Sequence, residues 1–231
     1  MDVVGFLRAC GARIETSYDH SFEVSGISEL PEHVEYTVIH DYLESGFFIL
    51  LGALCAEEFI DIEHARIGDL GSFLIKASEA GVCYELRSND TIRVHNSRSN
   101  LRAISLQTNV FPGFPTDIQS PFTVMLTQAE GISRVHEILF EGRFNMLMEL
   151  EAMKGHSAIL NPHEALIFGP TKLRGTTVTS WDLRSGASMI LAGLIAEGET
   201  RITNVEYIER GYEDILGKLR SLGIQIDRIE S

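Results

Sequence analysis

The feature that most constrains the fold of this chain is an internal repeat with a period of about seventy residues. Ala-Glu steps that end an apolar segment recur at Ala56, Ala129 and Ala196. Glycines that end an amphipathic segment recur with a similar period, at residues 11, 81, 155 and 223. The glycine at position 11 has no first half of a copy before it, so we expect the sequence to open inside a copy.

Within each copy the hydrophobic pattern predicts the order strand, helix, strand, helix, strand, strand. The closing strands are expected at residues 83–87 and 91–95 in copy one, 157–160 and 165–168 in copy two, and 224–229 in copy three. Copy three ends without room for its second hairpin strand. We therefore expect a sixth strand from sequence upstream of Met1.

Two segments, residues 46–56 and 186–196, are apolar all round and must be buried as helices. One such helix per copy should pack at the centre, with the sheets outside. The sequence thus predicts an α/β (α+β) fold of three βαβαββ repeats, at approximately 37–97, 98–169 and 170–231. Residues 1–36 are expected to be a remnant of the last repeat of another domain, with the boundary near Pro31.

The net charge of −14 and the pI near 4.9 argue against electrostatic binding to nucleic acid or to an anionic membrane. An anionic substrate would need a local cluster of positive side chains. The longest apolar runs are about half the length that spans a bilayer, and no signal peptide precedes Asp2. We expect no membrane segment.

The chain has three cysteines, Cys10, Cys55 and Cys83, each in an apolar context and without the spacing of metal ligands. The odd number argues against a disulfide framework, so we interpret them as small buried hydrophobic residues. A reducing, cytoplasmic location follows as the expectation.

An acidic residue precedes each apolar helix, and each is expected at the end of a strand: Asp41, Asp117 and Asp182. Helix capping alone explains such residues, since an Asp at a helix start accepts backbone N–H bonds. Asp117 follows a loop rich in proline and phenylalanine, and Asp182 follows the single tryptophan, Trp181. These surroundings favour a functional role for Asp117 and Asp182 beside the capping role.

Three arginines lie near turns or helix starts, Arg143, Arg184 and Arg210. A single arginine is usually a solvated surface residue. Arg143 and Arg210, however, lie at equivalent positions of two copies, each beside an acid and a glycine. Arginine pairs with phosphate and carboxylate through two parallel hydrogen bonds. One acid with several arginines in a cleft suits deprotonation of a hydroxyl beside a phosphorylated, carboxylated partner.

Other chemical signals are weak. The eight histidines form no close pair or HExxH motif, so no metal site is expected. The glycines form no nucleotide-binding loop, and residues 185–188 resemble a helix start rather than a nucleophile elbow. We expect no cofactor.

Several words of the sequence resemble UDP-N-acetylglucosamine enolpyruvyl transferases: FPGFPTDIQSPF, TQAEG, EGRF, DLRSGASMILAGLIAEGET and YIERGYEDILGKLRSLG. The similarity covers essentially the whole chain but only the C-terminal portion of the family. It implies an inside-out α/β barrel and enolpyruvyl transfer from phosphoenolpyruvate to the 3′-hydroxyl of UDP-N-acetylglucosamine, the first committed step of peptidoglycan synthesis.

The resemblance also implies roles for individual residues. Asp117 matches the residue proposed as general base for the 3′-hydroxyl, and Asp182 an acid in the same cleft. The backbone of Leu139 matches a contact to the uridine, and the neighbouring Thr116 and Phe140 are expected to bind substrate. Arg143, Arg184 and Arg210 match arginines that hold the carboxylate and phosphate of phosphoenolpyruvate.

The chain departs from the family at Tyr42, Gly142, Trp181 and residues 207–209. These departures leave open which sugar the chain prefers as substrate. The family's Lys-Asn pair and its mobile loop with a reactive Cys or Asp have no match, so we expect the chain alone to be inactive and a separate N-terminal half to be a possible partner. Two alternatives stay open: an inactive nucleotide-sugar-binding module, and a transferase acting on another UDP-sugar or nucleoside.

Overall fold

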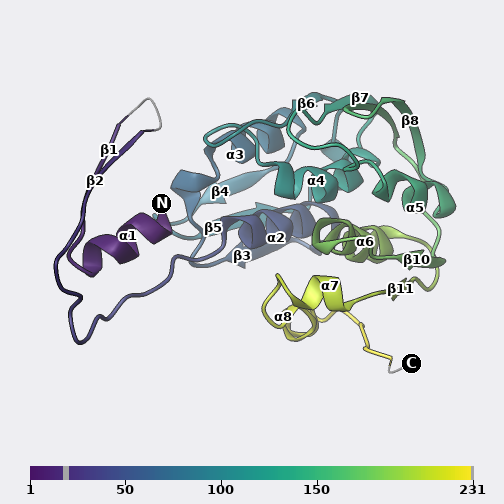
Figure 1. The fold of residues 1–231 in the computed structure, drawn as a ribbon. Coiled ribbons are helices and arrows are strands. Elements are labelled where there is room, and N and C mark those ends of the chain that lie inside the picture. Colours follow the sequence, from purple (N-terminus) through teal and green to yellow (C-terminus); the bar gives the residue numbers. More distant parts are fainter. Residues whose placement is uncertain (18–20, 230–231) are drawn as a thin grey trace. The chain divides into compact units, whose positions relative to one another are not determined.

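The computed structural model describes residues 1–17 and 21–229 (Figure 1). The chain divides into two compact units, Met1–His40 and Asp41–Ser231. The division falls a few residues after the boundary expected from the sequence.

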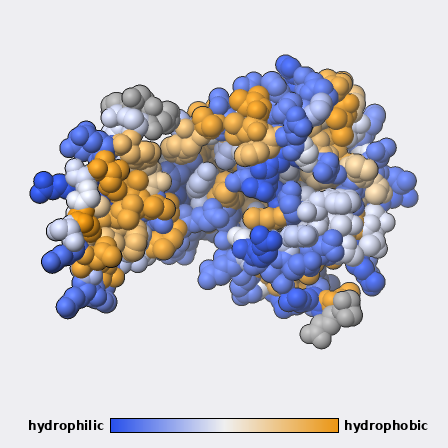
Figure 2. Space-filling view, in the orientation of Figure 1, coloured by the Kyte–Doolittle hydropathy of each residue, from blue (hydrophilic) through white to orange (hydrophobic). Residues whose placement is uncertain are grey.

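The first unit contains helix α1 (Asp2–Ala9) and the antiparallel strands β1 (Arg13–Thr16) and β2 (Phe22–Ser25). The Tyr36 hydroxyl donates to the Asp2 carboxylate at 2.9 Å and so ties the segment after β2 to the start of α1. Ile14 is buried, whereas many other apolar side chains of this unit are exposed (Figure 2). The helix and two strands follow the order expected for the end of a copy.

Three helices form the centre of the second unit: α2 (Tyr42–Cys55), α4 (Gln119–Leu126) and α6 (Leu183–Ile195). They pack against one another in pairs, as Figure 1 shows. Phe47, Phe122 and Met189 have no exposed surface. Helices α2 and α6 are buried because each is apolar around nearly its whole circumference, which confirms the predicted central layer. Helix α4 is buried as well, and its polar side chains Gln119 and Thr123 hydrogen-bond to each other.

The first two strands of copies two and three are parallel. Strand β6 (Ser105–Gln107) pairs with β7 (Gly131–His136), and β10 (Thr177–Thr179) pairs with β11 (Arg201–Thr203). Parallel strands need a crossover connection, and the buried helices α4 and α6 provide it. The crossover therefore places one buried helix between two outer strands in each of these two copies.

The hairpins of copies one and two add antiparallel strands to these sheets. Copy one has the order β3-β5-β4, from β3 (Phe59–Ile62), β4 (Tyr84–Leu86) and β5 (Ile92–His95). Copy two has the order β6-β7-β9-β8, completed by β8 (His156–Asn161) and β9 (Glu164–Gly169). In both copies the last strand inserts between the two before it. The apolar side of each inner strand faces the helices.

The amphipathic helices of the three copies are α3 (Gly71–Glu79), α5 (Met146–Ala152) and α8 (Ile215–Ser221), with the short α7 (Glu206–Glu209) before α8. Left-handed glycines follow α1, α3 and α8, at Gly11, Gly81 and Gly223. After α5 the left-handed residue is Lys154, with φ of 69°. Gly155 serves a close approach instead, since an added Cβ would lie 2.7 Å from the Leu150 carbonyl oxygen.

Four expectations about local structure were wrong. Residues 224–229 form no strand, nor do residues 37–40 before Asp41. A strand needs hydrogen bonds from a neighbour, and among the described residues β11 pairs with β10 alone. Ile224 and Ile226 nevertheless pack against the core, which explains their alternation. Asp117 and Asp182 lie after the ends of β6 and β10, not at them.

The cysteines differ in exposure. Cys10 and Cys55 are half-buried, but Cys83 is exposed. The interpretation of Cys83 as buried was wrong because alternation directs its neighbour Val82 inward and Cys83 outward. In the described part of the chain, no helix is long and apolar enough to cross a membrane.

Candidate functional site

Asp117 lies in the short helical turn η3 (Thr116–Ile118), between β6 and α4. Its neighbours Thr116 and Ile118 are buried, and Ile118 packs against α2. The turn therefore holds the Asp117 side chain outward, with 37% of it exposed. No side chain caps this turn. The Asp117 carboxylate is thus free of the capping role that the sequence allowed.

Two arginines contact the same oxygen of Asp117. Arg184 donates from Nε to Oδ1 of Asp117, and Arg143 Nη2 lies 3.4 Å from that oxygen. Arg184 comes from the first turn of α6, and Arg143 from the loop before α5. Residues that are far apart in the sequence therefore meet around one carboxylate.

The Arg143 side chain is only 9% exposed. Burial lowers its pKa, and the nearby Arg184 lowers it further. The acidic groups Asp117, Asp182 and Glu137 act in the opposite direction and raise the pKa of Arg143. Two guanidinium groups that repel each other beside one shared carboxylate provide a place where a further anion is favoured.

Asp182 caps helix α6. Its Oδ1 accepts from the backbone N–H groups of Arg184 (2.7 Å) and Ser185 (2.9 Å), and Ser185 completes a capping box. Asp41 caps α2 through the N–H of Leu43 at 2.8 Å. The capping interpretation therefore holds for these two acids, although Asp182 also affects Arg143 electrostatically. Asp117 alone of the three acids is used differently.

Arg210 follows α7 and is exposed. Its side chain has no hydrogen bond or ion pair to another residue that the structure describes, so it does not join the cluster around Asp117. Two residues later, the Tyr212 ring lies edge-on to Phe47, with centroids 5.4 Å apart. Burial raises the pKa of Tyr212, and the carboxylates of Asp41, Glu44 and Asp117 raise it further. The chain after Arg210 therefore lies within electrostatic reach of Asp117.

Glu137 is a site residue that sequence reasoning missed. It follows the end of β7 and has no exposed surface. Its Oε1 accepts from the backbone N–H groups of Leu139 (2.9 Å) and Phe140 (3.3 Å), and its Oε2 accepts from the Thr116 hydroxyl (2.7 Å). Thr116, Leu139 and Phe140, which are expected to bind substrate, therefore all donate a hydrogen bond to the carboxylate of Glu137.

A sequence signal for Glu137 did exist. Ser133 and Val135 alternate inward along β7 and are fully buried, and Glu137 is the next residue of that series. An acid at an inward position must be compensated by hydrogen bonds. The partners come from loops, however, and these could not be placed from the sequence pattern.

Two exposed aromatic side chains accompany the cluster. The Phe140 ring lies 4.9 Å from the guanidinium carbon of Arg143, a cation–π distance. Trp181, next to Asp182, donates from Nε1 to Glu149 at 2.8 Å and is also exposed. Both provide flat apolar surface near charged groups, an arrangement that suits a nucleotide-sugar.

The family comparison decides the class of protein. The family model described as EPSP synthase (3-phosphoshikimate 1-carboxyvinyltransferase) matches residues 1–219. The chain belongs to this family.

Curated members of the family named UDP-N-acetylglucosamine 1-carboxyvinyltransferase are similar over the whole chain. The protein from Thermodesulfovibrio yellowstonii is 37% identical over 230 residues, which cover 100% of this chain and 54% of the relative. The protein from Clostridium botulinum is 39% identical over 229 residues, which cover 99% and 54%. The chain spans about half the length of the curated relatives it matches.

Solved structures of the family agree. The enolpyruvyl transferase NikO from Streptomyces tendae matches with a TM-score of 0.87 and 28% identity, over 97% of this chain and 53% of that one. EPSP synthase from Acinetobacter baumannii matches with a TM-score of 0.65 and 19% identity, over 84% of this chain and 45% of that one. A likeness at this identity supports the fold alone. The predicted fold class and the resemblance to enolpyruvyl transferases are therefore confirmed.

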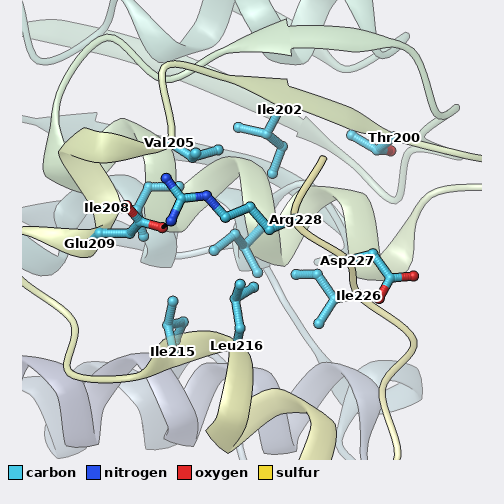
Figure 3. Close-up of a pocket in the computed structure, with 11 residues that line it drawn as sticks. Thr200, Ile202, Val205, Ile208, Glu209, Ile215, Leu216, Ile226, Asp227 and Arg228 are labelled. Carbon is cyan, nitrogen blue, oxygen red and sulfur yellow. Dashed lines mark ion pairs between the residues drawn. The ribbon is translucent and has the colours of Figure 1, made fainter. Parts of the chain in front are cut away.

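A hollow outside the cluster around Asp117 has a different character. It lies among α6, β11, α7, α8 and the segment after α8, and Ile190 is one of its apolar lining residues. Ile202 and Ile226 contribute further apolar surface (Figure 3). Glu209 and Arg228 form an ion pair of 2.8 Å among the lining residues. None of the predicted site residues lines this hollow. Among the described residues no group of acidic, His or Cys side chains could hold a metal ion.

Proposed function

We propose that this chain carries the substrate cluster of a UDP-N-acetylglucosamine 1-carboxyvinyltransferase, which transfers enolpyruvyl from phosphoenolpyruvate to the sugar 3′-hydroxyl. The observation that carries the proposal is the sharing of Asp117 between Arg143 and Arg184 in an otherwise acidic chain. Relatives of this name are similar over the whole chain and support the proposal. No cofactor is needed for this chemistry.

In the proposed reaction the 3′-oxygen adds to C2 of phosphoenolpyruvate while C3 takes up a proton, which gives a tetrahedral intermediate. Loss of a proton from C3 and of phosphate from C2 then restores the double bond of the enolpyruvyl group. Asp117 accepts the hydroxyl proton as general base. Arg143 and Arg184 turn from Asp117 towards the carboxylate and phosphate of phosphoenolpyruvate, because bidentate pairing with these groups is favourable in a half-buried site. Arg210 is proposed to join them when ligand is present, which the position of Tyr212 supports.

The remaining residues would hold the nucleotide-sugar. The backbone of Leu139 contacts the uridine, and the Phe140 ring and the turn at Thr116 line the same path. Asp182 holds the start of α6, so that Arg184 keeps its place, and adds negative charge beside the arginines. The enzyme's product is a precursor for peptidoglycan, which links the chain to cell-wall synthesis.

Calorimetry with UDP-N-acetylglucosamine tests this proposal. Binding is expected for the unchanged chain. Asp117→Asn should weaken the binding of UDP-N-acetylglucosamine, and Arg184→Lys should weaken the binding of phosphoenolpyruvate measured with the nucleotide-sugar present. Each loss should be at least about tenfold, since a charged hydrogen bond contributes about 1.5–3 kcal/mol. Arg93→Lys is the matched control, because Arg93 on β5 forms a similar ion pair with Asp61 on β3. Equal affinity in all four proteins would refute the assignment of the cluster.

We also propose that residues 1–231 alone do not turn over substrate. The family's Lys-Asn pair and its mobile loop with a reactive side chain have no match in this sequence, so the reaction needs residues from another part of the enzyme or from a separate polypeptide. Phosphate release from phosphoenolpyruvate and UDP-N-acetylglucosamine by the purified chain would overturn this proposal.

A second candidate is enolpyruvyl transfer to another UDP-sugar or nucleoside. Two observations favour it: the structural likeness to the enolpyruvyl transferase NikO, and the exposed Trp181 beside Asp182, where the family usually has a small residue. Calorimetry with a panel of UDP-sugars and nucleosides distinguishes the candidates. A preference of more than tenfold for another acceptor would replace UDP-N-acetylglucosamine in the proposal.

A further inference from the structure

Glu137 links two segments that meet at the candidate site. One segment is the loop before α4, which carries Thr116 and Asp117, and the other is the turn after β7, which carries Leu139 and Phe140. The two oxygens of one carboxylate bind one segment each. Oε2 accepts from the Thr116 hydroxyl at 2.7 Å, and Oε1 accepts from the Leu139 N–H at 2.9 Å.

The link is reinforced by Thr108. Its hydroxyl donates to Oε1 of Glu137 at 2.9 Å and accepts from the N–H of Ile138 at 3.1 Å. Glu137 therefore accepts hydrogen bonds on both carboxylate oxygens and from both of the segments that it links. A fully buried carboxylate is stable only with such compensation, and removal of the donors leaves a costly unpaired charge. The arrangement is rigid because each partner is itself buried or part of the backbone.

From this geometry we infer that Glu137 is a positioning residue that fixes the spacing between the Asp117 carboxylate and the backbone of Leu139. The inference rests on the proposed function, in which Asp117 meets the sugar 3′-hydroxyl and Leu139 meets the uridine. Both ends of one nucleotide-sugar would then be set by a single side chain. Glu137 itself touches neither substrate nor the reacting atoms.

A positioning role has a distinctive consequence. UDP reaches only the Leu139 side of the link, whereas UDP-N-acetylglucosamine must match both sides at once. Loss of the link should therefore weaken the binding of UDP-N-acetylglucosamine far more than the binding of UDP. A general loss of folding would weaken both ligands alike, so the ratio of the two affinities separates a positioning role from a merely structural one.

The variants are chosen to remove and to rebuild the link. Glu137→Leu keeps most of the side-chain volume and removes both ties. Glu137→Gln can rebuild them, because its amide oxygen accepts from the Leu139 and Phe140 N–H groups while its NH2 group donates to the Thr116 hydroxyl. Thr116→Val breaks the Oε2 tie alone and disturbs the fold least. Glu164→Gln, an ion-pair acid of β9 in the same sheet, is the matched control.

In calorimetry with UDP and with UDP-N-acetylglucosamine, the ratio of the UDP-N-acetylglucosamine affinity to the UDP affinity should fall at least tenfold in Glu137→Leu. Thr116→Val should show the same direction of change, and Glu137→Gln and Glu164→Gln should stay within threefold of the unchanged protein. An unchanged ratio in folded Glu137→Leu, or in Thr116→Val should the Leu variant not fold, would overturn the inference.

A ligand-independent measurement separates this inference from the proposed function. If the unchanged protein binds neither ligand, the proposed function fails. Hydrogen exchange of the Leu139 and Phe140 amides then still tests the link, since both should be protected in the unchanged protein and in Glu137→Gln but exchange faster in Glu137→Leu. Unprotected amides in the unchanged protein would show that Glu137 fixes nothing.

Discussion

Gly46 connects the buried core to the candidate site. A Cβ added at Gly46 in α2 would lie 2.1 Å from Cδ1 of Ile118, which is fully buried and directly follows Asp117. Overpacking of this kind costs about 1–3 kcal/mol, partly offset by the better helix propensity of alanine, about 1 kcal/mol. The approach of 2.1 Å is close, so the cost should lie at the upper end, and we expect Gly46→Ala to lose about 2 kcal/mol of unfolding free energy, which lowers Tm by roughly 4–8 °C.

The displaced Ile118 should also move Asp117 away from Arg143 and Arg184. We therefore expect Gly46→Ala to weaken UDP-N-acetylglucosamine binding by about tenfold in calorimetry at a temperature where the variant is folded. Gly52→Ala is the control, because its added Cβ would meet Ile60 of β3 at 2.7 Å on the same helix. Gly52→Ala should lose stability but keep the affinity. If both variants bind alike, Ile118 does not transmit the strain to Asp117.

Three further predictions concern stability. Burial raises the pKa of Cys55 to about 11 from 9.0, so folding keeps the thiol protonated and the associated stability, present below pH 9, is lost as the pH rises from 9 to 11. Urea unfolding should show that the unchanged chain loses about 2–3 kcal/mol more over this window than Cys55→Ala does, and equal losses would refute the burial argument. Asp41→Ala removes the cap of α2 and should lower Tm by about 2–4 °C, whereas Asp227→Ala should leave Tm unchanged. Calorimetric scans measure both values. An unchanged Tm for Asp41→Ala would contradict the capping role. Lys154→Gly should raise Tm by about 2–4 °C because φ of 69° suits glycine, and a lower Tm would mean that the Lys154 side chain contributes more than the strain costs.

The repeat made the central layer predictable. Helices α2 and α6 are apolar all round, and such a pattern has only one stable place, the interior. The hairpins β4–β5 and β8–β9 were also predictable, because alternation and turn residues are local signals. Segment 224–229 shows the limit of this reasoning. It alternates in the same way, but a strand depends on a hydrogen-bonding neighbour, which no pattern within the segment reveals.

The site was predictable in part. The chemistry of acid and arginines identified Asp117, Arg143 and Arg184, and the structure places these three together. The surroundings of the three acids set Asp41 apart, but they could not separate Asp117 from the capping acid Asp182, since that depends on where each carboxylate points. Arg210 stays apart from the cluster, and its role stays a prediction. Glu137 was missed because its four donors come from loops whose paths depend on tertiary packing.

The most direct test of the central proposal is a crystal structure of the chain with UDP-N-acetylglucosamine and phosphoenolpyruvate. We expect the sugar 3′-hydroxyl within hydrogen-bond distance, about 3 Å, of the Asp117 carboxylate. The guanidinium groups of Arg143 and Arg184 should then bind the phosphate and carboxylate of phosphoenolpyruvate. Ligand bound elsewhere, for example beside Arg228 in the apolar hollow, with Asp117 still paired to both arginines, would contradict the proposal.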